Sequence, residues 1–129
     1  SAWSTLRGHL KRPGLHIQRI EDSMATGIPD ANICYRGREM WLEGKWVGSM
    51  PKRLATVVRC GLRAEQATWL ESRALAGGEC YVWIRLADSG WLLVGHSWRD
   101  LVQGVVLEEM KDKWLWYGSG KQLAEELVR

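Results

Sequence analysis

Two carboxylates and one ammonium group occur at a spacing that suits the hydrolysis of a phosphodiester. Glu43 and Lys45 are two residues apart in an apolar run. In an extended strand such residues point to the same face, and the intervening Gly44 points to the other. Asp30 opens the preceding extended segment, and a hairpin turn at Gly37 would bring it beside Glu43. The two carboxylates and the ammonium would then meet at one edge of a sheet.

This group of residues predicts a site for a hard divalent cation, Mg²⁺ or Mn²⁺. Such cations prefer oxygen ligands, which Asp30, Glu43 and a backbone carbonyl near Gly44 would supply. A bound cation lowers the pKa of a water molecule and offsets charge on the attacked phosphate. Lys45 could orient that water or contact the phosphate as a point charge. A solvated strand face would carry the same charges without any function, so the spacing alone leaves both interpretations open.

Hydrophobic periodicity predicts the elements that must position these residues. Helices are expected at residues 1–10, at 63–75 and from 98 onward, and strands at 15–22, 31–35, 39–47, 80–87 and 91–95. Helices mixed with strands joined by hairpins are typical of an α/β or α+β fold with a mixed central sheet flanked by helices.

The remaining segments carry weaker signals. Residues 48–61 contain glycine, proline and basic residues and are expected to form a long loop. Ser97, with Asp100 three residues later, resembles a capping box for a helix that continues through Val105. Residues 113–117 are interpreted as a strand, and residues 121–128 as a short helix capped by Ser119.

Length and composition fit one soluble globular domain. The chain has 129 residues, of which 46% are hydrophobic and 26% charged. No apolar run approaches the roughly 20 residues of a membrane span, and the N-terminus does not resemble a signal peptide. The odd number of cysteines, none close together, favours reduced thiols in an intracellular protein.

The charge is distributed unevenly along the chain. Residues 1–63 carry 11 Lys and Arg against 5 Asp and Glu, whereas residues 64–129 carry 7 against 10. A basic first half suggests a polyanionic partner, DNA, although an uneven solvated surface would have the same composition. The candidates for contact with a DNA backbone are Arg7, Lys11, Arg12, Lys52, Arg53, Arg59 and Arg63. The nine tryptophans are mostly expected in the core, and the sequence does not indicate which of them could stack on bases.

Four short motifs in order resemble the virus-type replication–repair nuclease (VRR-NUC) family of the PD-(D/E)xK nuclease superfamily. They are Gly-Ile-Pro-Asp at residues 27–30, Glu-Gly-Lys at 43–45, the helix that contains Gln66, Trp69 and Leu70, and Gly77-Gly78 before a strand. The resemblance covers residues 15–95, which leaves 96–129 as a C-terminal extension of a single nuclease domain, 1–129. It implies a restriction-endonuclease-like core.

The resemblance also implies a role for each matched residue. Asp30 and Glu43 would bind the metal, and Lys45 would position or activate the attacking water. Gln66, on the first turn of its helix, would reach back into the site. Glu21 would complete the metal shell, with Asp22 as the alternative. The middle residue of Glu-x-Lys is usually a larger apolar residue than the glycine found here.

The function expected from these features is that of a Mg²⁺- or Mn²⁺-dependent DNA endonuclease of phage or bacterial origin. It would be structure-directed, acting on branched DNA that resembles a Holliday junction, in the host cytoplasm if it is phage-encoded. Two symmetric cuts would require a C₂ homodimer, for which residues 98–117 are the suggested interface. The alternatives are a monomeric nuclease on linear DNA and a non-catalytic DNA-binding module.

Overall fold

The computed structural model describes residues 1–20 and 27–129. Its main sheet is formed by β1 (Leu15–Arg19), β2 (Ala31–Tyr35), β3 (Arg38–Val47), β5 (Glu79–Leu86), β6 (Gly90–Val94) and β8 (Leu115–Tyr117). A small second sheet pairs β4 (Val57–Val58) with β7 (Val105–Val106). The helices are α1 (Ala2–Leu10), α2 (Ala64–Leu75), α3 (Trp98–Gln103), α4 (Leu107–Lys113) and α5 (Gly120–Leu127).

The main sheet is mixed, as the sequence predicts. Its order is β1-β2-β3-β5-β6-β8, and its parallel pair is β3 with β5. The chain returns from β3 to β5 through α2, the kind of helical crossover that a parallel pair requires. The first turn of α2 is thereby placed over β3, the strand that carries Glu43 and Lys45.

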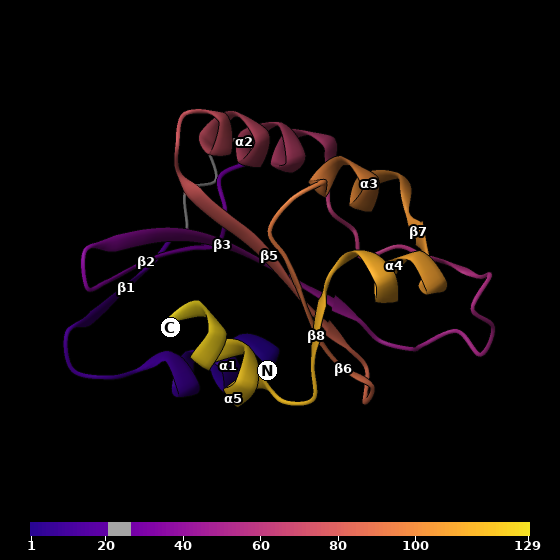
Figure 1. Ribbon diagram of the computed structural model, residues 1–129, viewed down its shortest axis with the longest axis horizontal. Helices are drawn as coiled ribbons and strands as arrows, with labels where there is room; N and C mark the ends of the chain where they lie inside the picture. Colours follow the sequence, from indigo (N-terminus) through magenta and orange to yellow (C-terminus); the bar gives the residue numbers. More distant parts are fainter. Residues whose placement is uncertain (21–26) are drawn as a thin grey trace.

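Helices cover both faces of the sheet (Figure 1). On one face, Leu70 of α2, Leu101 of α3 and Met110 of α4 belong to a core that includes Ile84. On the other face, α1 and α5 pack with Trp83 in a second core. The alternation of side chains along β5 divides the two cores, because Ile84 and Trp83 point to opposite faces.

The end of α3 differs from the expected helix through Val105. Ser97 has a left-handed backbone with φ of 59° and makes no side-chain capping bond, so the predicted capping box is wrong. The helix ends at Gln103 because Gly104 takes φ of +96°. A Cβ at Gly104 would lie 2.7 Å from Val57 Cγ1, so the chain passes close to β4 before it forms β7. A two-stranded ribbon therefore replaces the predicted last turn.

Other boundaries agree closely with the periodicity. β1 ends at Arg19, and the Ile20 N–H donates to Asp30 O at 2.8 Å. Residues 21 and 22 of the predicted strand lie outside the described residues. The loop 48–61 is irregular apart from β4. The predicted cap of α5 is confirmed, since Ser119 Oγ accepts from Gln122 N–H at 3.2 Å.

Most large apolar side chains of the C-terminal segment, residues 98–117, are buried in the core of the domain. Trp98, Leu101 and Trp114 are each no more than 5% exposed, whereas Leu115 is 58% exposed. An interface at residues 98–117 would have exposed aromatic and apolar side chains as its basis. That basis is wrong, because the folded domain buries most of them.

Two further expectations concern cysteines and the membrane. Cys34, Cys60 and Cys80 are free thiols. In the described ranges 1–20 and 27–129, no helix has the length and apolarity needed to cross a bilayer.

Candidate active site

Asp30 lies beside β3, where the sequence places it. β2 pairs with β3 so that Ala31 is opposite Leu42, which puts Asp30 level with Glu43. Asp30 Oδ2 accepts a hydrogen bond from Gly44 N–H at 2.9 Å. The two carboxylate residues are therefore held together by the register of the hairpin and by a direct bond to the backbone between Glu43 and Lys45.

Gly27 explains why the Gly-x-Pro-Asp motif needs a glycine. Its φ is +87°, and a Cβ at this position would lie 2.3 Å from the carbonyl oxygen of Glu65. The loop that leads into Asp30 thus packs directly against the first turn of α2, closer than any side chain would allow. This contact fixes the distance between the loop and the helix that carries Gln66.

Glu43 is buried at the centre of the site. Glu43 is 2% exposed to solvent. Its Oε2 lies 3.1 Å from Gln66 Nε2, which donates to it, and 3.3 Å from Lys45 Nζ. Its Oε1 is buried and has no hydrogen-bond partner among the described residues. A buried carboxylate oxygen without a partner is costly, and it is a natural ligand for a cation.

The environment of Glu43 disfavours its charge. Burial, and after it the nearby negative charge of Asp30, raise the pKa of the Glu43 carboxyl to about 7. Lys45 acts in the opposite direction but does not compensate. The buried carboxylate of Glu43 and the half-buried carboxylate of Asp30 repel each other, and with one ammonium beside them they form a site whose charge a divalent cation would balance.

Gln66 is held in one orientation by its own helix. The backbone N–H of Arg63 donates to Gln66 Oε1 at 3.0 Å. This bond commits the amide oxygen to the start of α2 and turns the amide nitrogen toward Glu43. The helix terminus therefore positions the Glu43 carboxylate through a neutral donor. Sequence reasoning missed the part played by the Arg63 amide, whose signal is the spacing of three residues that lets a Gln side chain cap a helix.

The donor set fits Mg²⁺ or Mn²⁺ as far as the structure describes it. Asp30 and Glu43 offer hard oxygen ligands, and the Gly44 carbonyl points to the same edge of β3 as the Gly44 N–H that binds Asp30. Within residues 1–20 and 27–129 no group of three His, Cys, Asp or Glu side chains could hold a metal. The predicted third carboxylate, Glu21 or Asp22, lies outside the described residues.

Gly44 departs from the usual apolar residue for a packing reason. A Cβ at Gly44 would lie 2.1 Å from Trp83 Cζ2, its partner in the parallel pair with β5. The Trp83 indole occupies the space that a middle side chain would fill. The glycine therefore belongs to the core on the far face of the sheet and leaves Glu43 and Lys45 on the near face.

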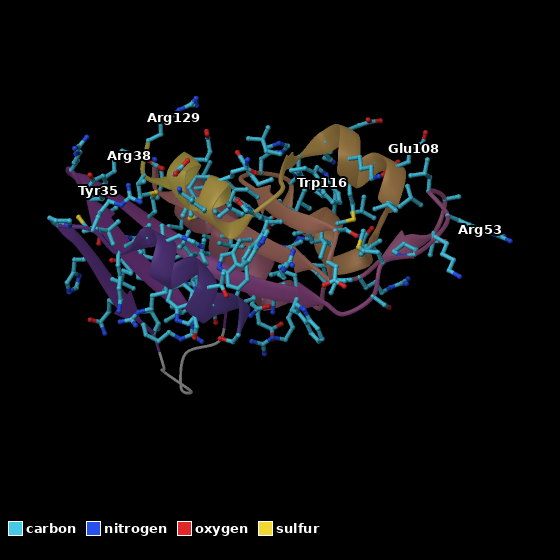
Figure 2. All side chains as sticks on the ribbon, turned by 90° about the horizontal axis from the view of Figure 1, so that it is seen from below. Tyr35, Arg38, Arg53, Glu108, Trp116 and Arg129 are labelled. Carbon is cyan, nitrogen blue, oxygen red and sulfur yellow. The ribbon has the colours of Figure 1, made fainter. Side chains whose placement is uncertain are left out.

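The candidate DNA-binding residues fall into two groups rather than one. Arg12, from the segment after α1, stacks at 5.9 Å on Tyr35, and Figure 2 shows Tyr35 and Arg53 at opposite ends of the molecule. The first group is Arg7, Lys11 and Arg12, and the second is Lys52, Arg53, Arg59 and Arg63. Arg63 also forms an ion pair with Glu65 at 3.1 Å. Only the second group comes directly after β3 in the sequence, and β3 is the strand that carries Glu43 and Lys45.

Comparison with known proteins identifies the fold but no family. No family model and no curated protein matches the chain. The solved structure of Hjc, a Holliday junction resolvase from the archaeal hyperthermophile Archaeoglobus fulgidus, is similar with a TM-score of 0.53 and 17% sequence identity. The similarity covers 86% of this chain and 87% of that one. The chain therefore has the restriction-endonuclease-like fold that its sequence predicts.

Proposed function

We propose that this chain is a divalent-metal-dependent DNA endonuclease that acts on branched DNA. The observation that carries the proposal is the buried Glu43 carboxylate, which lies beside Asp30 and Lys45 and has one oxygen without a described partner. Such a group costs stability in the absence of a cation, and cost of this kind is typical of functional sites. The fold shared with a Holliday junction resolvase supports the same class of substrate.

Each residue would have a distinct part in the reaction. Asp30 and Glu43 would hold the metal, with the Gly44 carbonyl and Glu21 as further ligands. A bound Mg²⁺ or Mn²⁺ would supply a water of lowered pKa and positive charge for the attacked phosphate. Lys45 would hold that water or the phosphate through its ammonium. Gln66 would keep the Glu43 carboxylate in place, as its hydrogen bond does here.

The residue pattern also supports a finer assignment. We propose that the chain belongs to the VRR-NUC family. Asp30, Glu43, Lys45 and Gln66 follow one another in the sequence in the order of that family's motifs, and in the structure they lie in contact. The presence of all four argues against a non-catalytic DNA-binding module.

A four-way junction compared with a linear duplex of the same arms tests the proposal. With Mg²⁺, we expect the junction to be cut near its branch point and the duplex to be cut slowly or not at all. Equal cleavage of both would favour a nuclease for linear DNA. Binding of both without cleavage, in Mg²⁺ and in Mn²⁺, would leave only a DNA-binding module.

A two-fold symmetric substrate also leads us to propose a homodimer inside the cell. Two symmetric cuts need two active sites related by a C₂ axis. Sedimentation of the free protein and of its junction complex would measure the stoichiometry. One protein chain on each cleaved junction would contradict the dimer but not the nuclease.

A further inference from the structure

We propose that Trp46 stacks on an unpaired base of the DNA beside the cleaved phosphate. This inference rests on the proposed function and deepens it, because it assigns the site a substrate with splayed or single-stranded nucleotides. Trp46 directly follows Lys45 on β3. Aromatic side chains that bind single strands do so by stacking, which tolerates any base.

Trp46 is the tryptophan that the fold leaves in solvent. It is 66% exposed, whereas Trp83, Trp91, Trp98 and Trp114 are each no more than 5% exposed and the other four are half-buried. Single exposed apolar side chains are ordinary. Here, however, three of the five large exposed hydrophobic side chains in residues 1–20 and 27–129, namely Trp46, Leu54 and Val57, fall within twelve residues of one another in the sequence.

The surroundings of Trp46 could accommodate a nucleic-acid base. The ring lies over Gly48, where a Cβ would be 2.9 Å from Trp46 Cη2. Beside the ring is an open hollow of about 410 Å³, which Met50, Val57 and Arg59 also line. The walls mix polar and apolar groups, with one cation, Arg59, and no carboxylate. A base can lie on the indole while its phosphates meet the arginine.

The local charge favours a polyanion over a protein partner. Residues 44–63 include five cations, Lys45, Lys52, Arg53, Arg59 and Arg63, and no Asp or Glu. A segment that combines exposed apolar side chains with charge of one sign is suited to nucleic acid, since cations neutralise phosphates while an aromatic ring holds a base. Figure 1 shows this segment as the loop that leaves the end of β3 and extends away from the sheet.

In this proposal one DNA strand would cross the edge of β3 from one face of the sheet to the other. β2 begins at Ala31, opposite Leu42, so residues 43–47 extend beyond the described part of β2. Along this edge Glu43 and Lys45 point to one face and Trp46 to the other. Three residues of strand separate Glu43 from Trp46 by about 10 Å. A strand of DNA that crosses the edge would place a base on Trp46 within roughly three nucleotides of the phosphate at Glu43.

The experiment measures binding with cleavage switched off. Junction, gapped and fully paired DNA carry 2-aminopurine near the expected cut, and EDTA removes divalent metal. We expect wild-type protein to quench 2-aminopurine in the junction and the gap. Trp46→Leu keeps apolar bulk but lacks an aromatic face, and should weaken binding of these two substrates by about 10- to 100-fold with no quenching. Trp46→Phe should restore most of both signals.

Leu75→Ala removes another exposed apolar side chain, 91% exposed at the end of α2, and is the matched control. It should bind like wild type. Equal loss of affinity by Trp46→Leu for all three DNAs, or no loss at all, would overturn the inference. A change of oligomeric state in Trp46→Leu would assign Trp46 to a protein contact instead. If wild-type protein cleaves the junction with Mg²⁺ while Trp46→Leu binds normally, the inference fails and the proposed nuclease stands. Absence of both cleavage and binding by wild type would reject both.

Discussion

Between Leu42 and Lys45, the two faces of β3 carry side chains of opposite character, charged on one face and apolar on the other. Toward α2 the strand presents Glu43 and Lys45, with a buried oxygen that has no described partner. Toward α1 and α5 it presents Leu42, fully buried, and Gly44, which fits against Trp83. At these residues the first face carries charge at the expense of stability, whereas the second is packed for stability. Because side chains alternate, adjacent residues of the strand can serve both purposes.

The largest effect is expected on the charged face. Glu43→Ala and Lys45→Ala should each reduce Mg²⁺-dependent junction cleavage by about 10³-fold or more, because each removes a group proposed to act on the reacting atoms. Circular dichroism should remain that of wild type. Glu125→Ala and Lys121→Ala change exposed residues of α5 and should cleave normally. Full activity in either Glu43→Ala or Lys45→Ala would remove the proposed site.

On the packed face, Gly44→Ala should destabilise the fold by about 3 kcal/mol, because the new Cβ would overlap the Trp83 ring. Urea unfolding measures this loss. Trp83→Leu in the same chain should recover part of it, so the double mutant should be less destabilised than the sum of the single mutants. Simple additivity would mean that the indole does not occupy the space beside Gly44.

Glu43→Gln tests whether the charged face costs stability. The pKa of Glu43 rises from 4.5 to about 7 on folding, so the folded state binds more protons between these values and stability falls as pH rises through this window. In EDTA, Glu43→Gln should therefore be more stable than wild type by about 2 kcal/mol at pH 8 and equal to it near pH 4. Mg²⁺ should reduce the difference at pH 8 by stabilising wild type. A variant less stable than wild type at pH 8 would contradict the stated cost.

The smallest effect is expected at Gln66, which contacts both the Glu43 carboxylate and the start of α2. Gln66→Ala removes the donor to Glu43 and the acceptor for the Arg63 amide, and should lower junction cleavage about tenfold. The dependence on Mg²⁺ concentration should shift upward in the same variant. Gln103→Ala, at the exposed end of α3, is the control. An unchanged Mg²⁺ dependence would show that Gln66 serves α2 rather than the carboxylate.

The sequence predicts the residues of the candidate site better than it predicts the packing that holds them in place. Periodicity and motif order place Asp30, Glu43, Lys45 and Gln66 together because a hairpin and one crossover are enough to join them. The packing of Gly44 against Trp83 depends on a pairing 39 residues apart, and no local pattern contains it. The end of α3 has a local signal in Gly104, but the two-stranded ribbon that follows depends on the pairing of β7 with β4, which no local pattern contains.

The contact of Gly44 with Trp83 has a consequence for how such sequences can diverge. A bulky residue at position 44 and a tryptophan at position 83 exclude each other, so a lineage cannot change one without first losing stability. Relatives with a larger middle residue in Glu-x-Lys should carry a smaller residue at the position that matches Trp83. The two positions should covary in an alignment, although neither touches the reacting atoms.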